Sequence, residues 1–467
     1  MFSESDASAV HVGRADRAVS LGGGDASETY LSIARILDAA RSSGADAIHP
    51  GYGFLAESAE FARAVEGAGL VWIGPPAEAI DGMGDKLRAR ARMREAGVPV
   101  VPGSDGDATD ASALAAAAER LGFPVLVKAS AGGGGKGMSR VDRAADLPAA
   151  LEGARRIAAA AFGDETLYLE KLLERPRHVE LQVFADRHGN TVHLFERECS
   201  VQRRHQKIVE ETPSPALDAG LRRAMGEAAV EAARAVGYVG AGTIEFLLDA
   251  DRQFYFLEAN TRLQVEHPIT EATLGLDLVR WQIEVAQGGV LPDEWRSGAL
   301  RPRGHAIEMR LYAEDPVTFL PRTGTVLDYA EPGGPGVRLD SGIAAGSEVS
   351  VEFDPLLAKL VAWAEDRPAA IARASRALRE LVVLGVETNT PLLEAVLASE
   401  EFRSGDYDTG LVPRLPPIEE RPVPPAVWIA AAAAFDEGGS RPGGATVPSA
   451  ADPWSTTNGW RPGGSAP

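Results

Sequence analysis

The sequence predicts an α/β protein built from two to four domains, and three observations support this. The chain has 467 residues, which is long enough for several separate cores. Helix-like and strand-like segments alternate between residues 28 and 76, a rhythm typical of a parallel sheet covered by helices. A glycine-rich loop at residues 132–137 then joins two strand-like segments, and an acid-rich strand ends near residue 260. These two later features are where we expect chemistry.

The composition limits the classes of function. Acidic residues outnumber basic ones, 67 to 47, and the net charge of −20 is unlike that of a nucleic-acid-binding surface. The single cysteine, Cys199, excludes an internal disulfide, fits a reducing compartment and is expected to be buried. No stretch reaches the roughly 18 apolar residues of a membrane span, and the first residues show no secretory signal. We therefore expect a cytoplasmic protein that binds neither nucleic acid nor membrane.

The first predicted elements alternate between helix and strand. Residues 28–43 have helical periodicity, and residues 45–49 form a short apolar strand. A rigid turn at residues 50–53 leads to a helix at 57–68 and a strand at 70–73. No strand precedes the first helix, so the predicted parallel sheet lacks its first strand.

The later elements are predicted from hydrophobic periodicity and from the positions of glycine and proline. In order, they are a helix at 85–98, an alanine-rich helix ending at Leu121, strands on both sides of the glycine loop, a helix at 146–160, a strand at 166–171, a hairpin at 178–186 and 191–197, helices at 216–236 and 276–287, short strands within 304–363, and a helix at 367–381. From about Gly410 onward the composition is that of a linker.

Carboxylates on two predicted strands indicate a metal site. Glu258 and Asn260 point to one face of the strand that begins at Tyr255, because side chains alternate along a strand. Glu245 lies in an earlier strand-like run. Two carboxylates and an amide oxygen suit Mg²⁺, which prefers oxygen ligands and keeps substrate phosphates in its shell. The alternative is a charged loop that makes surface ion pairs.

A small-anion site is predicted immediately after these residues. Arg262 offers a planar cation, and Glu266 is close enough in sequence to act as a base on a bound anion. A solvated loop would not need the fixed order Asn-x-Arg-x-Gln-x-Glu-His, so we favour a site.

The glycine loop is predicted to be a flap over phosphates. Its backbone can approach phosphate oxygens because no Cβ intervenes, and Lys128 and Lys136 add positive charge. A dinucleotide-binding loop would open a helix, whereas this loop opens a strand. It also departs from the Walker pattern, because Gly137 stands where serine or threonine should follow the lysine. The alternative is a mobile hairpin without a ligand.

Other polar positions give weaker signals. Lys86 at a helix start could contact phosphate, and Glu170 and Lys171 could lie at a purine edge, although each alone could be solvated. The basic run at residues 203–207 is expected to face an anion in this acidic chain. Arg310 could point into a cleft or make a structural ion pair with a neighbouring glutamate.

Six segments together resemble the biotin carboxylase component of biotin-dependent acyl-CoA carboxylases, a member of the ATP-grasp superfamily. In order within residues 10–410, they are His49-Pro-Gly-Tyr-Gly-Phe-Leu55, Met83-Gly-Asp-Lys86, Lys128-Ala-Ser-Ala-Gly-Gly-Gly-Gly-Lys-Gly-Met138, Pro176-Arg-His-Val-Glu180, Glu196-Arg-Glu-Cys-Ser-Val-Gln-Arg-Arg-His-Gln-Lys207 and Glu258-Ala-Asn-Thr-Arg-Leu-Gln-Val-Glu-His-Pro268. Each segment alone is unspecific, but the combination in this order is specific. The resemblance implies an ATP-grasp fold with an incomplete Rossmann-like N-terminal domain, a flap domain and a β-rich C-terminal domain.

The resemblance also implies how ATP and its metal would be held. Lys86, Lys128 and His178 would contact the phosphates, and the loop of Gly133, Gly134, Gly135 and Lys136 would close over them. Adenine would be held by Glu170 and by the backbone at Lys171 and Leu173. Gln202 and His205 would help to place the ribose. The same resemblance makes Glu245, Glu258 and Asn260 the ligands of Mg²⁺ or Mn²⁺.

Bicarbonate and biotin complete the implied site. The resemblance gives bicarbonate contacts to Lys207, Arg262, Gln264 and the Val265 backbone. Glu266 would take the bicarbonate proton, and the resulting anion would attack ATP to form carboxyphosphate. Tyr52, Gly53 and Arg310 would face biotin held by a carrier, with Arg310 stabilising its enolate.

The implied domains follow one another along the chain. They are an N-terminal domain at 1–84, an ATP-grasp domain at 85–290 with a flap at about 101–173, a C-terminal domain at 303–410, and a linker or tail at 411–467. Family members begin with a further βα unit of about 30 residues, so we expect the sequence as given to be poorly soluble or inactive. No Met-Lys-Met attachment sequence occurs, so biotin is expected on another chain or beyond Pro467.

The expected partners are a biotin carboxyl carrier, a carboxyltransferase β subunit and a second copy of the chain. Two alternatives of different kinds stay open at this stage. The chain could be another ATP-grasp ligase module, related to urea carboxylase, pyruvate carboxylase or carbamoyl-phosphate synthase. It could also be a truncated subunit without catalysis, which would not bind ATP and Mg²⁺. The final acyl-CoA acceptor would depend on the carboxyltransferase partner.

Overall fold

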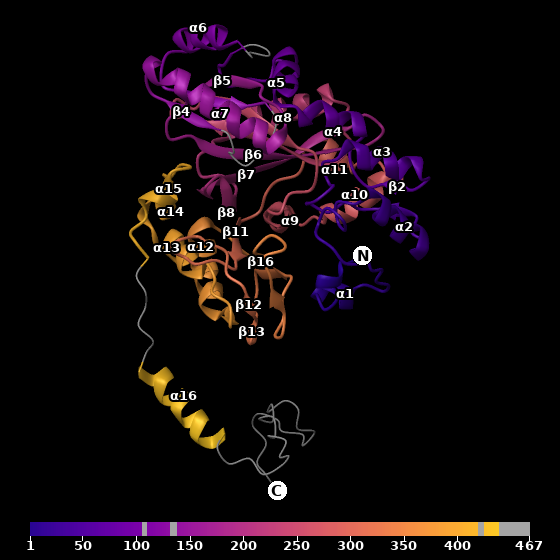
Figure 1. Ribbon diagram of the computed structural model, residues 1–467, viewed down its shortest axis with the longest axis vertical. Helices are drawn as coiled ribbons and strands as arrows, with labels where there is room; N and C mark the ends of the chain where they lie inside the picture. Colours follow the sequence, from indigo (N-terminus) through magenta and orange to yellow (C-terminus); the bar gives the residue numbers. More distant parts are fainter. Residues whose placement is uncertain (105–109, 131–137, 419–424, 439–467) are drawn as a thin grey trace. The chain divides into compact units, whose positions relative to one another are not determined.

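The computed structural model describes residues 1–104, 110–130, 138–418 and 425–438. The chain divides into a large unit, residues 1–418, and a small unit, residues 419–467, and each is described by itself (Figure 1). Helices and strands alternate through the large unit, which confirms the predicted α/β class. Four residues of the predicted closing loop lie outside the described residues: Gly133, Gly134, Gly135 and Lys136.

The N-terminal part contains the predicted parallel strand pair. β1 (Ala47–Ile48) and β2 (Val71–Trp72) run parallel, and α3 (Ala59–Gly67) connects them. α2 (Ile33–Ser43) precedes β1 and ends at Gly44, whose φ of 69° lies in the left-handed region that glycine adopts easily. Shorter helices flank this part of the chain: η1 (Glu4–Asp6), α1 (Val10–Arg14) and α4 (Ala77–Gly84).

A three-stranded antiparallel sheet follows, in the order β4-β3-β5. Its strands are β3 (Val125–Ala129), β4 (Ser139–Val141) and β5 (Leu167–Lys171). The segment between β3 and β4 therefore joins two antiparallel strands, as predicted for the glycine loop. Buried side chains of α6 (Ala111–Leu121) and α7 (Leu147–Phe162) form the core of this part with β3 and β5.

An eight-stranded antiparallel sheet runs through the rest of the large unit, in the order β10-β9-β6-β7-β8-β11-β16-β14. The strands in chain order are β6 (Arg177–Ala185), β7 (Thr191–Arg203), β8 (Gln206–Thr212), β9 (Gly240–Leu248), β10 (Phe254–Asn260), β11 (His305–Tyr312), β14 (Val337–Ser341) and β16 (Leu356–Ala364). β8 pairs with β11, with Glu210 opposite Glu308, so strands more than 90 residues apart form one continuous sheet. Hydrogen bonding across this pair fixes the two halves of the sheet relative to each other.

Helices cover both ends of the large sheet. Buried residues of α5 (Lys86–Glu95) and α8 (Ala219–Ala235) pack on β6 and β9, whereas α12 (Arg367–Glu380) and α13 (Thr390–Ala398) pack on β11 and β16 (Figure 1). α9 (His267–Leu274) lies against the middle strands β7, β8, β11 and β16. Its N-terminus is therefore brought to the centre of the sheet.

Apart from α16, the remaining elements are short. They are η2 (Ala144–Asp146), α10 (Leu278–Ala286), α11 (Asp293–Arg296), β12 (Gly324–Thr325), β13 (Asp328–Ala330), β15 (Glu348–Val349), β17 (Val382–Leu384), α14 (Glu400–Ser404), α15 (Leu411–Arg414) and, in the small unit, α16 (Pro425–Gly438). Among the described residues, no helix has the length and apolar character that crossing a membrane requires.

The prediction that the linker begins at residue 411 is wrong for the first residues of that range. Leu411 and Val412 are buried in the core formed with α12 and α13, and Ile418 packs against the same core. The large unit accordingly continues to Ile418. Composition alone misplaced the boundary because two apolar side chains suffice to anchor a proline-rich segment.

A buried ionic network ties this C-terminal part to the sheet. Glu211 on β8 accepts hydrogen bonds from His305 Nε2 at 2.6 Å and from Arg367 Nε and Nη2 at 2.7 and 2.9 Å, and Tyr407 also donates to it. Burial alone would raise the pKa of Glu211, but these donors lower it to about 2. Ionised Glu211 therefore stabilises the fold at pH values above 4.5, the pKa of this group in the unfolded chain. This stabilisation is lost as the pH falls toward 2.

We predict that Glu211→Gln destabilises the large unit. Removing one partner of a buried ion pair costs about 3 kcal/mol and should lower the melting temperature by about 3 °C near neutral pH. Calorimetry across pH is the measurement, and the difference from wild type should shrink as the pH falls below 4.5. Glu352→Gln, at an exposed position, is the control. Equal melting temperatures for Glu211→Gln and wild type at neutral pH would contradict the network's role.

Candidate active site

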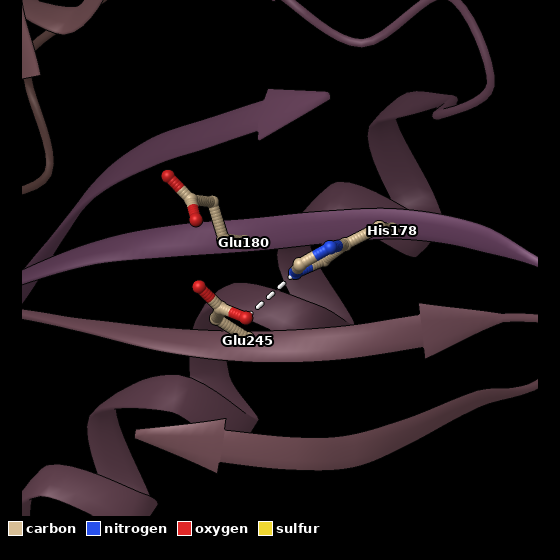
Figure 2. Close-up of side chains that lie close together, drawn as sticks. All are labelled: His178, Glu180 and Glu245. Atoms are coloured by element: carbon tan, nitrogen blue, oxygen red, sulfur yellow. Dashed lines mark ion pairs between the residues drawn. The ribbon is translucent and has the colours of Figure 1, made fainter. Parts of the chain in front are cut away.

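Three carboxylates stand in a row across the strands β10, β9 and β6. Glu258 is directly opposite Glu245, and Glu245 is directly opposite Glu180. His178 lies two residues from Glu180 on β6, and its Nε2 is 2.8 Å from Glu245 Oε2 (Figure 2). Burial alone would lower the pKa of His178, but the adjacent Glu245 carboxylate raises it above its usual value. The sheet register therefore assembles an acidic face with one imidazole.

The ammonium group of Lys207 lies at the centre of this face. Its Nζ contacts Glu180 Oε2 at 2.5 Å, Glu245 Oε1 at 2.7 Å and Glu266 Oε1 at 2.8 Å. Burial alone would lower the pKa of Lys207, but these three carboxylates raise it well above its usual value. One buried cation thus links residues of β6, β8, β9 and the start of α9.

Glu266 is fully buried at the N-terminus of α9, where it is the residue before the first helical position. Its second carboxylate oxygen lies 2.9 Å from Arg310 Nη2. Burial alone would raise the pKa of Glu266, but Lys207, Arg310 and Arg197 hold it well below its usual range. The carboxylate is therefore ionised at neutral pH and lies between two cations.

The Arg262 guanidinium lies beside this cluster and is surrounded by acceptors. Its Nη2 donates to Asn260 Oδ1 and its Nη1 to Gln264 Oε1, both at 3.2 Å. Its Nε lies 3.1 Å from Glu57 Oε2, which belongs to the N-terminal part of the chain. Asn260 Nδ2 and Gln264 Nε2 in turn donate to Glu245 Oε1, at 2.8 and 3.3 Å. The predicted anion residues thus form one hydrogen-bonded network with the predicted metal ligand.

The predicted phosphate and adenine residues form a second cluster. Lys128 Nζ donates to Glu170 Oε2 at 2.9 Å, and Arg90 donates to the other Glu170 oxygen. Both Lys128 and Glu170 are buried. Lys86 Nζ lies 3.7 Å from Glu258 Oε2, so it connects this cluster to the acidic row. Burial lowers the pKa of Lys86, only partly offset by Glu258.

The turn between β7 and β8 places two further predicted residues differently. Gln202 is buried and hydrogen-bonds His178 Nδ1 at 2.5 Å and Cys199 O at 2.9 Å. His205 is exposed in the two-residue turn, where both Arg204 and His205 have positive φ, 50° and 67°. A two-residue turn between antiparallel strands favours positive φ at both of its central residues, so the hairpin itself accounts for these angles. Gln202 therefore belongs to the buried cluster, whereas His205 is free to meet a ligand.

The predicted biotin residues lie near the start of α9. Tyr52 is 43% exposed, and its ring centroid is 5.6 Å from Lys359 Nζ. The same ammonium donates to the Val265 carbonyl at 2.5 Å. Gly53, beside Tyr52, is exposed. A cation of β16 thus connects the exposed Tyr52 to the backbone that precedes Glu266.

Family models cover most of the chain. The biotin carboxylase N-terminal domain matches residues 1–80, the carbamoyl-phosphate synthase L chain ATP-binding domain matches 85–294, and the biotin carboxylase C-terminal domain matches 308–414. A biotin carboxylase from Halalkalibacterium halodurans is 47% identical over 88% of this chain and 91% of that protein. The chain belongs to the biotin carboxylase family.

Other relatives extend beyond this region. The α subunit of methylcrotonoyl-CoA carboxylase from Dictyostelium discoideum is 50% identical over 88% of this chain, which spans 59% of that subunit. A crystal structure of a Campylobacter jejuni biotin carboxylase–ATP complex has a TM-score of 0.86 and 44% identity over 88% of this chain and 92% of that one. The biotin carboxylase domain dimer of Hydrogenobacter thermophilus 2-oxoglutarate carboxylase, solved with MgADP and bicarbonate, has a TM-score of 0.85 and 42% identity over 90% and 93%.

The oxygens in the acidic row fit the divalent cation that a biotin carboxylase with ATP would need. Glu245 and Glu258 are opposite each other on adjacent strands, and Asn260 is hydrogen-bonded to Glu245. Carboxylate and amide oxygens are the ligands that Mg²⁺ and Mn²⁺ prefer. His178, Lys86 and Lys207 neutralise the row in this structure. The donor set is therefore suitable, and cationic side chains balance its charge.

Two basic side chains of these segments, Arg203 and Lys171, make contacts within the protein. Arg203 was expected to face an anion, but it pairs with the buried Glu314 and stacks on Phe319, so it is structural. Lys171 lies at the end of β5, where its Nζ donates to Gly122 O at 2.8 Å and its backbone amide donates to Pro102 O. Leu173 follows in the partly buried segment after β5.

Sequence reasoning did not single out several residues of the biotin carboxylase cluster. They are Glu57, Glu180, Glu210 and Lys359, which contact predicted site residues, and Arg197, which pairs with Glu180. Glu180 could have been found, because it alternates with His178 along one strand. Glu57 gives no such signal, because its partner Arg262 is 205 residues away in sequence.

We predict that Lys207→Met destabilises the protein most strongly at neutral and higher pH. Lys207 holds the pKa values of Glu245 and Glu266 below 4.5, so its contribution to stability is present above that pH and is lost as the pH falls. Without it, three buried carboxylates lack their shared cation. Melting temperatures at about pH 3, below that value, and at about pH 8, above it, should show the larger drop at the higher pH.

Addition of Mg²⁺ should restore part of that loss, because a divalent ion can replace the missing positive charge. Arg280→Met, on the exposed face of α10, is the control. A Lys207→Met penalty that is the same at both pH values would argue against charge balance as the cause.

Proposed function

We propose that this chain carboxylates biotin with ATP and bicarbonate, the first half-reaction of a biotin-dependent carboxylase. The observation that supports this most directly is the position of Glu266, a buried, ionised carboxylate held between Lys207 and Arg310. This arrangement offers a base and two cations beside carboxylates suited to Mg²⁺. The family membership and the ATP- and bicarbonate-bound neighbours point to the same reaction.

In this proposal, bicarbonate binds beside Glu266. Lys207, Arg262 and Gln264 provide side-chain contacts, and the Val265 backbone provides another. The bicarbonate O–H donates its proton to Glu266, and the resulting dianion attacks the γ-phosphorus of ATP, releasing ADP and forming carboxyphosphate. Bicarbonate takes over part of the Lys207 contact, so the pKa of Glu266 rises when it must accept the proton.

ATP binds along the cluster that connects the three-stranded sheet to the acidic row. Lys86, Lys128 and His178 contact its phosphates, and Glu170, the Lys171 and Leu173 backbone, Gln202 and His205 contact adenine and ribose. Gly133, Gly134, Gly135 and Lys136 are proposed to close over the phosphates. Mg²⁺ or Mn²⁺ held by Glu245, Glu258 and Asn260 would neutralise phosphate charge during transfer.

Biotin meets carboxyphosphate at the opposite side of Glu266. Tyr52 and Gly53 contact the biotin ring, and the Arg310 guanidinium stabilises the ureido enolate. Carboxyphosphate breaks down to CO₂ and phosphate, the phosphate takes the ureido N–H proton, and the enolate nitrogen attacks CO₂. Arg310 is suited to this because Glu210 and Glu266 fix its orientation.

The proposal also covers the domain boundaries, the location and the partners of the chain. We propose domains at 1–84, at 85–290 with a flap at about 101–173, and from 303 to the end of the large unit at 418, and a cytoplasmic location. A biotin carboxyl carrier and a carboxyltransferase β subunit are the proposed partners, and two copies of the chain pair, as in the Hydrogenobacter domain dimer. The methylcrotonoyl-CoA carboxylase relatives favour an acyl-CoA carboxylase α subunit.

The test is bicarbonate-dependent ADP release that free biotin stimulates. Glu266→Gln and Arg262→Ala should each lower kcat by about 100-fold or more, because proton transfer or bicarbonate positioning is lost. ATP affinity, measured by calorimetric titration, should change by less than about threefold, because neither residue contacts ATP.

Glu284→Gln and Arg280→Ala, an exposed ion pair on α10, are the matched controls. ADP release that ignores biotin in the wild type would refute the proposed reaction. ATP affinity that falls as far as kcat in the variants would refute the roles of Glu266 and Arg262.

A further inference from the structure

Behind Arg310 lies a second pair of carboxyl groups that the proposed reaction does not use. Glu308 on β11 is directly opposite Glu210 on β8, and both side chains have no exposed surface. Residues opposite each other on antiparallel strands have Cβ atoms about 4.5–5.5 Å apart, so the two carboxyl groups are neighbours. This pairing follows from the β8–β11 register that makes the large sheet continuous.

The two carboxyl groups differ in how they are satisfied. Glu210 Oε1 accepts from Arg310 Nε at 2.7 Å and lies 2.6 Å from Arg310 Nη2. Glu210 Oε2 and both oxygens of Glu308 accept no hydrogen bond from any residue that the structure describes. Three orphaned carboxylate oxygens in a buried site would be costly, because burying an unpaired polar group costs free energy.

The surrounding charges do not compensate for two ionised groups. The charged groups that act on the pair are Arg310 on β11, Lys359 on β16, Lys207 on β8 and Glu266 at the start of α9. Tyr312 on β11 also interacts electrostatically with Glu210, and His267 follows Glu266 in the chain and lies near Lys359. Arg310 is shared with Glu266, and Lys359 is engaged with the Val265 carbonyl and lies 3.6 Å from Asp340. Burial lowers the pKa of His267 to about 3, so it adds no positive charge at neutral pH.

We propose that Glu308 and Glu210 share one proton and act together as positioning residues for Arg310. Protonated Glu308 donates its O–H to Glu210 Oε2, and Glu210 Oε1 remains ionised and holds the guanidinium toward Glu266. The shared proton satisfies Glu210 Oε2 and one oxygen of Glu308, and it leaves one negative charge on the pair. Arg310 is thereby held from two sides, by Glu210 and by Glu266.

The direction of both pKa shifts agrees with this arrangement. Burial raises the pKa of Glu308 well above its usual value, and the neighbouring Glu210 raises it further. Burial also raises the pKa of Glu210, to about 7, although Arg310 acts against it. Two neighbouring buried carboxylates rarely ionise together, so a proton is retained near neutral pH.

Loss of the shared proton has a predictable consequence for the reaction. At high pH a second negative charge appears behind Arg310 and draws the guanidinium away from Glu266 and the ureido oxygen. The neutralised arginine then stabilises the enolate less well. The expected result is a fall in biotin-dependent kcat on the alkaline side, with the KM for ATP unchanged.

The kinetic test compares two substitutions of Glu308 and rests on the proposed function. Glu308→Gln supplies a permanent N–H donor to Glu210, whereas Glu308→Met has similar length and no donor. At about pH 7, kcat with biotin should fall by about tenfold or more in Glu308→Met and by less than about threefold in Glu308→Gln. The alkaline fall of the wild type should be absent in Glu308→Gln.

A purely structural role would make both substitutions act equally at every pH, and that result would overturn the proposal. A Glu308→Gln variant that keeps the wild-type alkaline fall would also overturn it.

A spectroscopic test does not depend on catalysis. The infrared difference between wild type and Glu308→Gln near neutral pH should contain the C=O stretch of a protonated carboxylic acid, and this band should vanish at high pH. Glu211→Gln, which removes the neighbouring ionised carboxylate on β8, should leave that band in place. Absence of the acid band from the wild type would overturn the shared proton. Presence of the band in a protein without biotin-stimulated ADP release would refute the proposed function and leave the carboxyl pair intact.

Discussion

The contact of Lys207 with Glu180, Glu245 and Glu266 is the interaction on which the rest of the site depends. These carboxylates come from two strands and a helix start, and all three are buried. Burying several negative charges without a counterion would cost several kcal/mol for each ion. One ammonium group on β8 offsets part of that cost for all three.

The continuous sheet extends this charge balance from the proposed ATP side to the proposed biotin side. Glu245 belongs to β9, near one edge of the sheet, whereas Arg310 belongs to β11, beyond β8. Glu266 connects them, because one of its oxygens contacts Lys207 and the other contacts Arg310. A change in charge at the phosphate side therefore acts directly on the residue that is proposed to stabilise the biotin enolate. No hinge is required for this coupling, because three side chains in contact provide it.

The sequence predicted the features that depend on local pattern. The alternation of Glu258 and Asn260 along one strand, and the helix start at Lys86, follow from rules that act over a few residues. The pairing of Glu180 with Glu245 depends on register between β6 and β9, 65 residues apart, and no local rule sets it. The same limit explains the error at Arg203, whose buried partner Glu314 is 111 residues away. The positive charge of the segment indicated an anion site, but the Arg203 guanidinium already pairs with the carboxylate of Glu314.

Arg262 shows why a correctly predicted residue still needs its long-range partners to be understood. Its guanidinium donates to Asn260, Gln264 and the Leu263 carbonyl, and its Nε faces Glu57. In the proposed role, bicarbonate meets a guanidinium with most of its donors already in use, so a two-point contact requires it to replace one of these acceptors. Glu57 is the acceptor most easily displaced, because its side chain is 43% exposed and can be solvated when released. The affinity for bicarbonate is then set by the difference between the free energies with which bicarbonate and Glu57 bind the same guanidinium. This competition keeps bicarbonate binding weak and favours a small planar acceptor over a bulky one. The N-terminal segment that supplies Glu57 also supplies Tyr52 and Gly53, so release of Glu57 would couple bicarbonate binding to the proposed biotin surface.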